Sequence, residues 1–486
     1  MYRVTSGSTK HLSDVESFIS MLDTLSDYPD PKVRSFFDPD SDLIITRAPG
    51  RLDVMGGIAD YSGSLVLQLP IAEAALVALQ KTPDRTIRIL SLPAYGEDEI
   101  LDFEIPLAAI EDGNHAIGYE AARSYFRHQP WAAYIAGAFL VLMRERGIVF
   151  PNGTRIMIRS SVPQGKGVSS SAAIEVATMQ AIAAAFDIVI DPIDLALLCQ
   201  KVENLIVGAP CGVMDQMTSV CGEAGRLLRL RCQPATPEQT LSVPDSLRFV
   251  GIDSGIRHSV SGSDYTSVRT GAFMGYRIIA ELASLHVTQS ATDTVEIDDP
   301  IWHGYLANLT PSEFEQRFSA SLPEIMAGAG FLTQYDGITD SVTTVDDMRT
   351  YAVLAPTAHP VFENFRVEAF AELLSGSLSA ASRRVLGELM YQSHASYSKC
   401  GLGSTGTDLL VRLARESGPT RGIYGAKITG GGSGGTVAVM CDAAAIDVVE
   451  EIADKYESQT GYRPYIFNGT SMGATQFRHL RLEPVR

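Results

Sequence analysis

The chain has 486 residues and a formal net charge of −18, from 39 Lys and Arg against 57 Asp and Glu. Such an acidic surface repels nucleic acid and anionic membranes, so we expect neither as a partner. Apolar residues make up 45% and charged residues 20%, as in soluble globular proteins, and the length favours two domains. Six cysteines without a CxxC pair, and an N-terminus without a signal-peptide core, predict a cytoplasmic protein with neither a disulfide framework nor a zinc site.

Strand and helix patterns are intermixed along the chain without regular βα alternation, which favours an α+β fold over a doubly wound sheet. The predicted elements, in chain order, are an amphipathic helix beginning near residue 13, strands at 41–52, 64–71 and 74–80, a buried helix from 131, a strand at 154–159, an Ala-rich helix at 171–186, a buried strand at 246–255 and a strand–turn–strand unit at 427–440. An acidic, irregular segment at 286–350 is expected to be an elaborated insertion of helices and loops.

The first strand runs into "RAPGRLDVMGGIADYSGS", residues 47–64. A Pro-Gly turn places an arginine, Arg51, ahead of an acid, Asp60. Between them lies a small apolar pair, Gly57 and Ile58, in a stretch otherwise suited to polar contacts.

The stretch "PQGKGVSSSAAIEVA", residues 163–177, joins a glycine-rich loop to the start of a helix. Glycines let the backbone approach a ligand, and the free N–H groups and dipole of the helix attract phosphate. A hydroxyl such as that of Ser171 can ligate magnesium. The spacing is not that of a Walker A loop. A serine N-cap after a glycine-rich loop is the structural alternative.

Two further stretches carry candidate residues. "VENLIVGAPCGVMDQMTS", residues 202–219, places the acids Glu203 and Asp215 in apolar contexts, where a carboxylate needs a partner or a role. "KITGGGSGGTVAVM", residues 427–440, has five glycines in six positions, which permit close packing against a ligand or another loop. On its own this cluster is also compatible with a structural turn.

In this order the motifs "RAPGR…ADYSG", "PxGxGVSSSAA", "PCGVMDQ" and "ITGGGSGG" resemble the GHMP small-molecule kinase family, and most closely its galactokinase branch. The resemblance covers about residues 47–440, with support from "IDSGIRHSVSGSDY" at 252–265 and "GELMYQSHASY" at 387–397. It implies a ribosomal-protein-like N-terminal lobe over 1–240, a ferredoxin-like C-terminal lobe over 241–486 that carries the insertion, and an active site in the cleft between them.

The resemblance also implies roles for individual residues. The catalytic residues are Asp215, next to the hydroxyl to be phosphorylated, and Arg51 beside it. Magnesium is held by Ser171 and Glu203. The implied ATP-binding residues are Pro163, Gly165, Gly167, Ser169, Ser170, Ser171 and Ala172. The implied sugar-binding residues are Asp60, Gly57, Ile58, Tyr61, Gly212 and Tyr265. Ser433 stands where the family often has an aromatic residue.

The pair at 57 and 58 bears on the substrate, because galactokinases usually carry Glu-His here, facing the exocyclic hydroxymethyl group of galactose. L-Arabinopyranose has the galactose ring stereochemistry without that group. The resemblance therefore favours an ATP- and magnesium-dependent sugar 1-kinase acting on L-arabinose, with Ile58 filling the vacated volume. A galactokinase, a uronic-acid 1-kinase and a non-catalytic galactokinase-like sugar sensor remain alternatives. The sequence leaves open whether the protein is a monomer or a homodimer.

Overall fold

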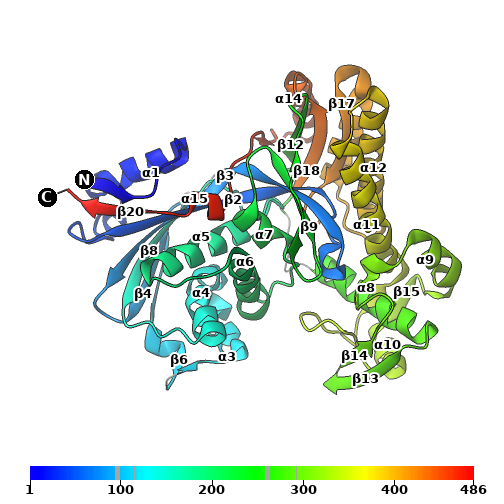
Figure 1. Cartoon of the computed structure of the whole chain (residues 1–486), viewed down its shortest axis with the longest axis horizontal. Helices are drawn as coiled ribbons and strands as arrows, with labels where there is room; N and C mark the ends of the chain where they lie inside the picture. Colours follow the sequence, from blue (N-terminus) through cyan, green and yellow to red (C-terminus); the bar gives the residue numbers. More distant parts are fainter. Residues whose placement is uncertain (94–98, 114, 258–262, 292, 486) are drawn as a thin grey trace.

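A computed structural model describes all residues except 94–98, 114, 258–262, 292 and 486. Residues 258–262 of the predicted supporting stretch at 252–265 therefore lie outside the described residues. Two lobes lie side by side, with the insertion at one end of the second lobe (Figure 1). None of the described helices combines the length and the apolar character needed to cross a membrane.

A large, mostly antiparallel sheet organises the N-terminal lobe, with one parallel pair between β4 and β8. Its order is β1 (Tyr2–Ser6), β20 (His479–Pro484), β2 (Leu43–Met55), β3 (Leu65–Thr82), β8 (Gly153–Ser160), β4 (Thr86–Ser91) and β5 (Leu101–Pro106). β3 also pairs with β9 (Arg226–Arg231), which carries β10 (Thr236–Pro237) and β11 (Leu241–Ser242). The separately predicted strands at 64–71 and 74–80 thus form a single strand.

Helices cover both faces of this sheet because its strands alternate between two cores. Ile44 belongs to the core shared with α4 and α5, whereas its neighbours Leu43 and Ile45 pack on α1. The helices on the first core are α3 (Tyr119–Tyr125), α4 (Pro130–Arg146), α5 (Ser170–Ala185), α6 (Pro192–Lys201), the π-helix η5 (Val202–Val207) and α7 (Met214–Cys221). On the other face lie α1 (Ser13–Asp23) and α2 (Pro31–Arg34), and α15 (Ala474–Phe477) leads into β20. Short elements complete the lobe: η1 (Leu25–Asp27), η2 (Asp60–Ser62), η3 (Leu107–Ala109), β6 (Glu111–Asp112), β7 (His115–Ala116) and η4 (Phe126–His128).

The C-terminal lobe is built on a four-stranded antiparallel sheet backed by long helices. The strand order is β17 (Ile423–Ile428), β18 (Thr436–Asp442), β12 (Leu247–Asp253) and β19 (Ile466–Phe467). Its helices are α8 (Ser263–Leu282), α11 (Leu354–Ser375), α12 (Ala380–Lys399), α13 (Thr405–Ser417), η8 (Pro419–Arg421) and α14 (Ile446–Thr460).

The segment at 286–350 contains short strands as well as helices and loops, and it packs into one hydrophobic core together with α8 and the start of α11. It contains β13 (His286–Ala291), β14 (Thr294–Asp298), η6 (Leu306–Asn308), α9 (Pro311–Arg317), η7 (Ser319–Ser321), β15 (Ile325–Ala327) and α10 (Gly328–Tyr335), and β16 (Thr350–Ala352) closes it. The sequence did not suggest its strands, which form two two-stranded antiparallel sheets: the hairpin β13–β14, and β15–β16, whose strands are separated in sequence by α10.

The chain's last strand departs from the predicted division at residue 240. β20 lies between β1 and β2, so residues 479–484 belong to the N-terminal sheet rather than to the second lobe (Figure 1). β11 also lies past the predicted boundary and pairs with β9. Pairings between strands this distant in sequence leave no local signal, which explains the difference.

A fully buried ion pair joins the two lobes. Lys427 Nζ of β17 lies 2.6 Å from Asp53 Oδ2 of β2, and neither side chain has any exposed area. Gln68 donates to the other carboxylate oxygen at 2.7 Å, and the Asp53 amide donates to Thr429 Oγ1 at 2.8 Å. These bonds fix the strand that enters the 56–64 loop against the second lobe.

We predict that Lys427→Met lowers the free energy of unfolding by about 3–5 kcal/mol, because it leaves Asp53 buried without its partner. Denaturant titration at neutral pH measures the change. Lys455→Met, on the exposed face of α14, is the control and should stay within about 0.5 kcal/mol of wild type. Equal stabilities for the two variants would contradict the structural role given to the pair.

Candidate active site

A cavity of ≈ 410 Å³ lies between the lobes, and most of the predicted site residues line it. Those that do are Arg51, Ile58, Asp60, Gly165, Gly167, Ser169, Ser170, Ser171, Glu203, Gly212, Asp215 and Tyr265. The remaining predicted site residues do not line the cavity; these are Gly57, Tyr61, Pro163 and Ala172. Because Tyr265 and the glycine loop come from the second lobe, the cavity needs both lobes.

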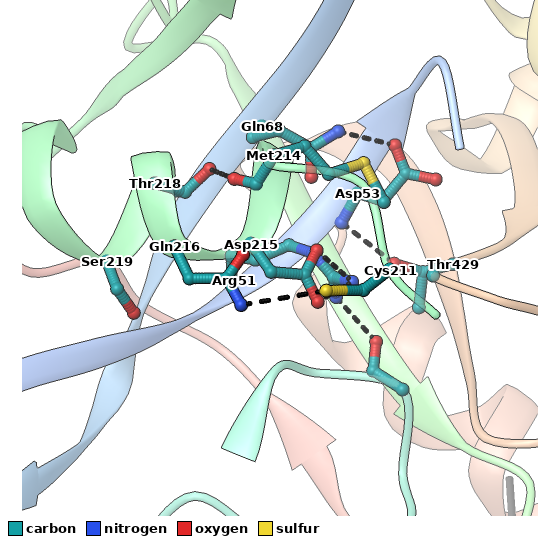
Figure 2. Close-up of polar contacts among 12 residues, drawn as sticks. Arg51, Asp53, Gln68, Cys211, Met214, Asp215, Gln216, Thr218, Ser219 and Thr429 are labelled. Carbon is teal, nitrogen blue, oxygen red and sulfur yellow. Dashed lines mark hydrogen bonds and ion pairs between the residues drawn. The ribbon is translucent and has the colours of Figure 1, made fainter. Parts of the chain in front are cut away.

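Arg51 and Asp215 form the central ion pair of the cavity, as Figure 2 shows. Arg51 Nε lies 3.0 Å from Asp215 Oδ1, and its Nη2 lies 2.8 and 2.9 Å from the two carboxylate oxygens. Arg51 Nη1 also donates to the Gly167 carbonyl at 2.7 Å. The arginine is almost fully buried, while Asp215 keeps 21% of its side chain exposed toward the cavity. A bidentate pair of this kind fixes the carboxylate in position and orientation.

Two more acids lie beside this pair. Glu203 accepts a hydrogen bond from Gln216 Nε2 at 2.7 Å, and the same nitrogen lies 3.1 Å from Glu175 Oε2. Burial, and next the charge of Asp215, raise the pKa of Glu203 to about 7, although its hydrogen bond with Ser171 works in the opposite direction. Burial, and next Glu203, likewise raise the pKa of Glu175 well above its usual range. Acids held this close repel one another and favour a bound cation or proton.

The loop before α5 has the features of a phosphate site rather than of a simple helix cap. Ser169 precedes the first turn with φ of 62°, and its side chain makes no capping hydrogen bond. Its hydroxyl is buried without a partner in the described chain, on a residue that lines the cavity. A buried hydroxyl without a partner is costly, so a ligand that bonds to it is the natural explanation.

The glycine-rich turn between β17 and β18 packs directly against this loop. A Cβ on Gly430 would lie 2.9 Å from the Gly167 carbonyl oxygen, and one on Gly435 would lie 2.7 Å from that of Lys166. Thr436 Oγ1 donates to the same Lys166 carbonyl at 2.8 Å. Close packing against another loop, which the sequence predicted as one option, is therefore confirmed, and Gly430 and Gly431 also line the cavity.

Asp60 is the buried acid on the opposite side of the cavity. Its Oδ1 has no hydrogen-bond partner in the described chain. Burial, and next the charge of Asp215, raise its pKa from 3.8 to about 6, whereas Arg269 lowers it. Gly212 is required here, since a Cβ on it would lie 1.7 Å from Asp60 Oδ2. The ring of Tyr265 stands edge-on to that of Tyr61, with centroids 6.1 Å apart.

Gly57 does not reach the cavity, although the sequence placed it in the sugar site. A Cβ on it would lie 1.8 Å from Tyr397 Oη and 2.3 Å from Asp53 Oδ2, so the space beside it is already filled. The imidazole Nε2 of His359 lies 3.0 Å from the Gly57 carbonyl oxygen. The glycine is thus explained by backbone packing against the second lobe.

Ile58 does line the cavity, and it adopts φ of 52°, which is unusual for a β-branched residue. It is 1% exposed and packs with Tyr265, Val268 and Tyr397 of the second lobe. A strained residue at a cavity wall points to a functional role, because packing elsewhere must hold it in place.

Several residues that line the cavity or contact its lining escaped the sequence analysis. Glu175 and Gln216 lie inside quoted motifs, but their helical setting gave no sign that they would meet Glu203. Trp131 and Tyr134 of α4 belong to a stretch interpreted as a buried helix, yet both line the cavity. One of only two tryptophans, next to a proline at a helix start, was the one available signal.

Comparisons with known proteins identify the family. Models of the GHMP kinase N-terminal domain and C-terminal domain match residues 133–223 and 372–458. A galactokinase from Chloroflexus aggregans is 30% identical over 86% of this chain and 89% of its own length. The chain belongs to the GHMP kinase family.

Other relatives of this GHMP kinase are similar over most of its length. The L-arabinokinase of Arabidopsis thaliana is 44% identical over 99% of this chain, which spans about half, 52%, of that relative. The galactokinase of Lactococcus lactis, solved with galactose, has a TM-score of 0.70 at 18% identity, covering 94% of this chain and 98% of that one. A mevalonate kinase of Methanococcus jannaschii has a TM-score of 0.53 at 15% identity, covering 88% and 98%. The last two show the fold.

The burial of Asp60 predicts a pH-dependent stability. The folded protein binds the Asp60 proton with a pKa of about 6, against 3.8 ordinarily, so this group's contribution is present below pH 4 and lost as the pH rises through 6. The Asp60→Asn variant has no ionisable group at this position, so it does not lose stability in this way as the pH rises. We expect its stability relative to wild type to rise between pH 4 and 7 by up to about 3 kcal/mol.

Thermal unfolding of the ligand-free protein across this pH range checks the prediction. Asp194→Asn on the exposed part of α6 serves as the matched control and should follow wild type at each pH. A stability difference for Asp60→Asn that stays constant with pH would show that Asp60 ionises normally.

Proposed function

We propose that this GHMP kinase transfers the γ-phosphate of ATP to the anomeric hydroxyl of a sugar, most specifically L-arabinose. The observation that carries this proposal is the meeting, in one cavity, of the unpartnered Ser169 hydroxyl at the start of α5 with the Arg51–Asp215 pair. A phosphate-binding helix start and a fixed carboxylate are the two parts that phosphoryl transfer to a hydroxyl requires.

ATP binding is supported at both ends of the cavity. The N–H groups and dipole at the start of α5 suit the phosphates. An apolar wall with two aromatic rings suits the adenine base, and its side chains are Leu101, Pro130, Trp131, Tyr134, Ile135, Ile174 and Val207. We therefore assign the nucleotide to the space between α4 and α5.

Magnesium fits the side chains beside the phosphate site. Ser171 and Glu203 supply the oxygen ligands that Mg²⁺ prefers, and phosphates and water complete its shell. Among the described residues no group of three His, Cys, Asp or Glu side chains could hold a metal ion. When bound, the ion neutralises phosphate charge. The raised pKa of Glu203 indicates that its surroundings disfavour an ionised carboxylate without a bound cation.

Asp215 and Arg51 act on the sugar hydroxyl. The partly exposed carboxylate of Asp215 accepts the hydroxyl hydrogen bond and orients the oxygen for attack. Arg51 holds that carboxylate fixed in direction through its bidentate hydrogen bonds. Its link to the Gly167 carbonyl ties this geometry to the phosphate loop, so donor and acceptor are held in one frame.

The sugar side is assigned to Asp60, Ile58, Gly212 and Tyr265, with Tyr61 supporting them from behind. Asp60 presents an unpartnered oxygen to ring hydroxyls, while Ile58 presents a branched alkyl group. A pentose such as L-arabinose has no exocyclic group to place against it. The similarity to the Arabidopsis L-arabinokinase supports the same substrate.

A uronic acid fits less well, because its carboxylate needs a cation. Among the described side chains that line the cavity, the only Lys or Arg is Arg51, and it is paired with Asp215. A sugar sensor without turnover is disfavoured because most of the predicted catalytic and phosphate-loop residues line the cavity, although Pro163 and Ala172 do not. ADP release, measured over a panel of aldoses and uronates with ATP and magnesium, tests the proposal; no turnover with any of them would falsify it.

All six cysteines are free, which supports a reducing, cytoplasmic location as part of the proposal. We also propose that the two lobes divide near residue 240, with 479–484 returned to the first lobe.

We predict that Asp215→Asn lowers turnover by about 10²-fold or more, because it keeps the shape but removes the charged acceptor. Nucleotide affinity, measured by calorimetry, should be retained. Asp194→Asn is again the control for the loss of a carboxylate. Near-normal turnover by Asp215→Asn would place the chemistry elsewhere.

The second prediction concerns the substrate preference. Wild type should prefer L-arabinose over galactose by about 5- to 150-fold, because the galactose hydroxymethyl loses water against Ile58 without gaining a partner. Gly57 has no room for a side chain, so the test falls on position 58 alone. Ile58→Asn tolerates the positive φ and supplies a polar group, which should raise kcat/KM for galactose relative to L-arabinose.

Ile58→Val keeps a branched alkyl group and should preserve the wild-type ratio. The measurement is steady-state kcat/KM for both sugars on the three proteins. A wild-type preference for galactose, or equal ratios for the Asn and Val variants, would remove Ile58 from the specificity argument.

A further inference from the structure

The insertion at 286–350 reaches the active site through one buried ion pair. Arg269 of α8 donates to Asp340 through Nε at 2.7 Å and through Nη2 at 2.8 Å. Both residues are 5% exposed. A bidentate pair shielded from water has a defined geometry, so it can transmit position from one segment to another.

Asp340 is itself fixed by its own segment. Its carboxylate accepts hydrogen bonds from the Val342 amide at 3.2 Å, the Thr343 amide at 3.3 Å and the Thr343 hydroxyl at 2.7 Å. The carboxylate therefore cannot rotate freely toward another partner. It is an anchor for the guanidinium and more than a source of charge.

The third nitrogen of Arg269 reaches the sugar side of the cavity. Nη1 donates to the Cys211 carbonyl at 3.1 Å, immediately before Gly212, which packs on Asp60. The guanidinium also lies 5.3 Å from the centroid of the Tyr61 ring. Arg269 thus holds both surfaces that flank Asp60, the 211–212 turn and the Tyr61 ring, without lining the cavity itself.

A second contact joins the insertion to the same loop. A Cβ on Gly63 would lie 2.4 Å from Tyr305 Cδ1, so the two pack closely. Gln233 Nε2 lies 2.8 Å from both the Gly63 carbonyl oxygen and Asn308 Oδ1. The end of the 56–64 loop is therefore supported by the insertion as well.

We propose that the Arg269–Asp340 ion pair is a positioning device through which the insertion sets the geometry and charge of the sugar site around Asp60. Arg269 is a positioning residue, since it acts through Cys211, Tyr61 and Asp60. This inference rests on the proposed function, because it concerns the site assigned to the sugar.

The first test compares two arginines of the same helix. Arg269→Lys keeps the positive charge but loses the planar guanidinium that bonds to both carboxylate oxygens of Asp340. Arg277→Lys makes the same change two turns on, at a buried arginine that bonds to the Tyr335 carbonyl of the insertion at 3.2 Å and to Glu281 at 3.0 Å, neither of which lines the cavity. Arg269→Lys should weaken L-arabinose binding about tenfold or more, with ATP binding unchanged, while Arg277→Lys leaves both unchanged.

The second test uses pH, which a purely structural role would not affect. The ionisable groups that interact with Asp60 are Asp215, Asp53, Arg269, Tyr61, Tyr265, Tyr397 and Cys232, and of these Arg269 is the cation that lowers the pKa of Asp60. Arg269→Gln removes that charge, so the pH at which sugar affinity falls on acidification should move upward. In Asp340→Asn the positive charge of Arg269 is no longer neutralised by a carboxylate, so the midpoint of the fall in sugar affinity should move to lower pH.

L-Arabinose binding without nucleotide, measured by calorimetry between pH 5 and 8, provides both readouts. Equal effects of Arg269→Lys and Arg277→Lys would overturn the proposal, as would midpoints that move in the same direction or not at all. If Arg269→Lys does not fold, Asp340→Asn decides alone through its downward midpoint. Absence of binding and turnover in wild type would instead refute the sugar-kinase function, so the two failures are distinguishable.

Discussion

The buried pair between Asp53 and Lys427 is the interaction on which the arrangement of the site depends. It connects β2, the strand that leads into the 56–64 loop, with β17, the strand that leads into the glycine-rich turn before β18. Tyr397 adds a second connection, because its hydroxyl donates to the Gly430 carbonyl at 2.8 Å while occupying the space beside Gly57. Burying two charges is expensive, so the pair contributes defined geometry more than net stability. Its consequence is that the two halves of the cavity cannot shift independently.

Three carboxylates at or beside the cavity are buried in surroundings that disfavour their negative charge, and bound ligands would offset this cost. Asp60, Glu175 and Glu203 are all buried, and all have pKa values raised by burial together with neighbouring acids. The ligand-free protein therefore maintains carboxylates in an environment that disfavours their charge. Hydroxyl donors on one side, and a cation with phosphates on the other, are the partners that would offset this cost. Active sites often carry such a stability penalty because function needs the unsatisfied groups.

The sequence was sufficient for the fold class and for twelve of the residues that line the cavity, because these lie in recognisable local motifs. The glycines and serines at 165–171 and the acids at 203 and 215 lie in motifs that resemble those of the GHMP kinase family, and this resemblance pointed to them. Contacts between distant segments were not readable in this way. Tyr397, which excludes any side chain at position 57, lies 340 residues away in the chain, so Gly57 was placed in the pocket. Glu175 was overlooked because a single acid in an Ala-rich helix has no distinctive pattern until Gln216 is placed beside it.

The position of β20 has a consequence for how the protein is made. β1 pairs only with β20 in the described sheet, and β20 in turn separates β1 from β2. During synthesis β1 therefore has no native strand to pair with until the residues near 479–484 have left the ribosome. Contacts of such long sequence separation form slowly because the intervening chain must first be ordered. Both lobes and the insertion lie between these two strands in sequence, so this edge of the first sheet can be completed only after all three have been synthesised.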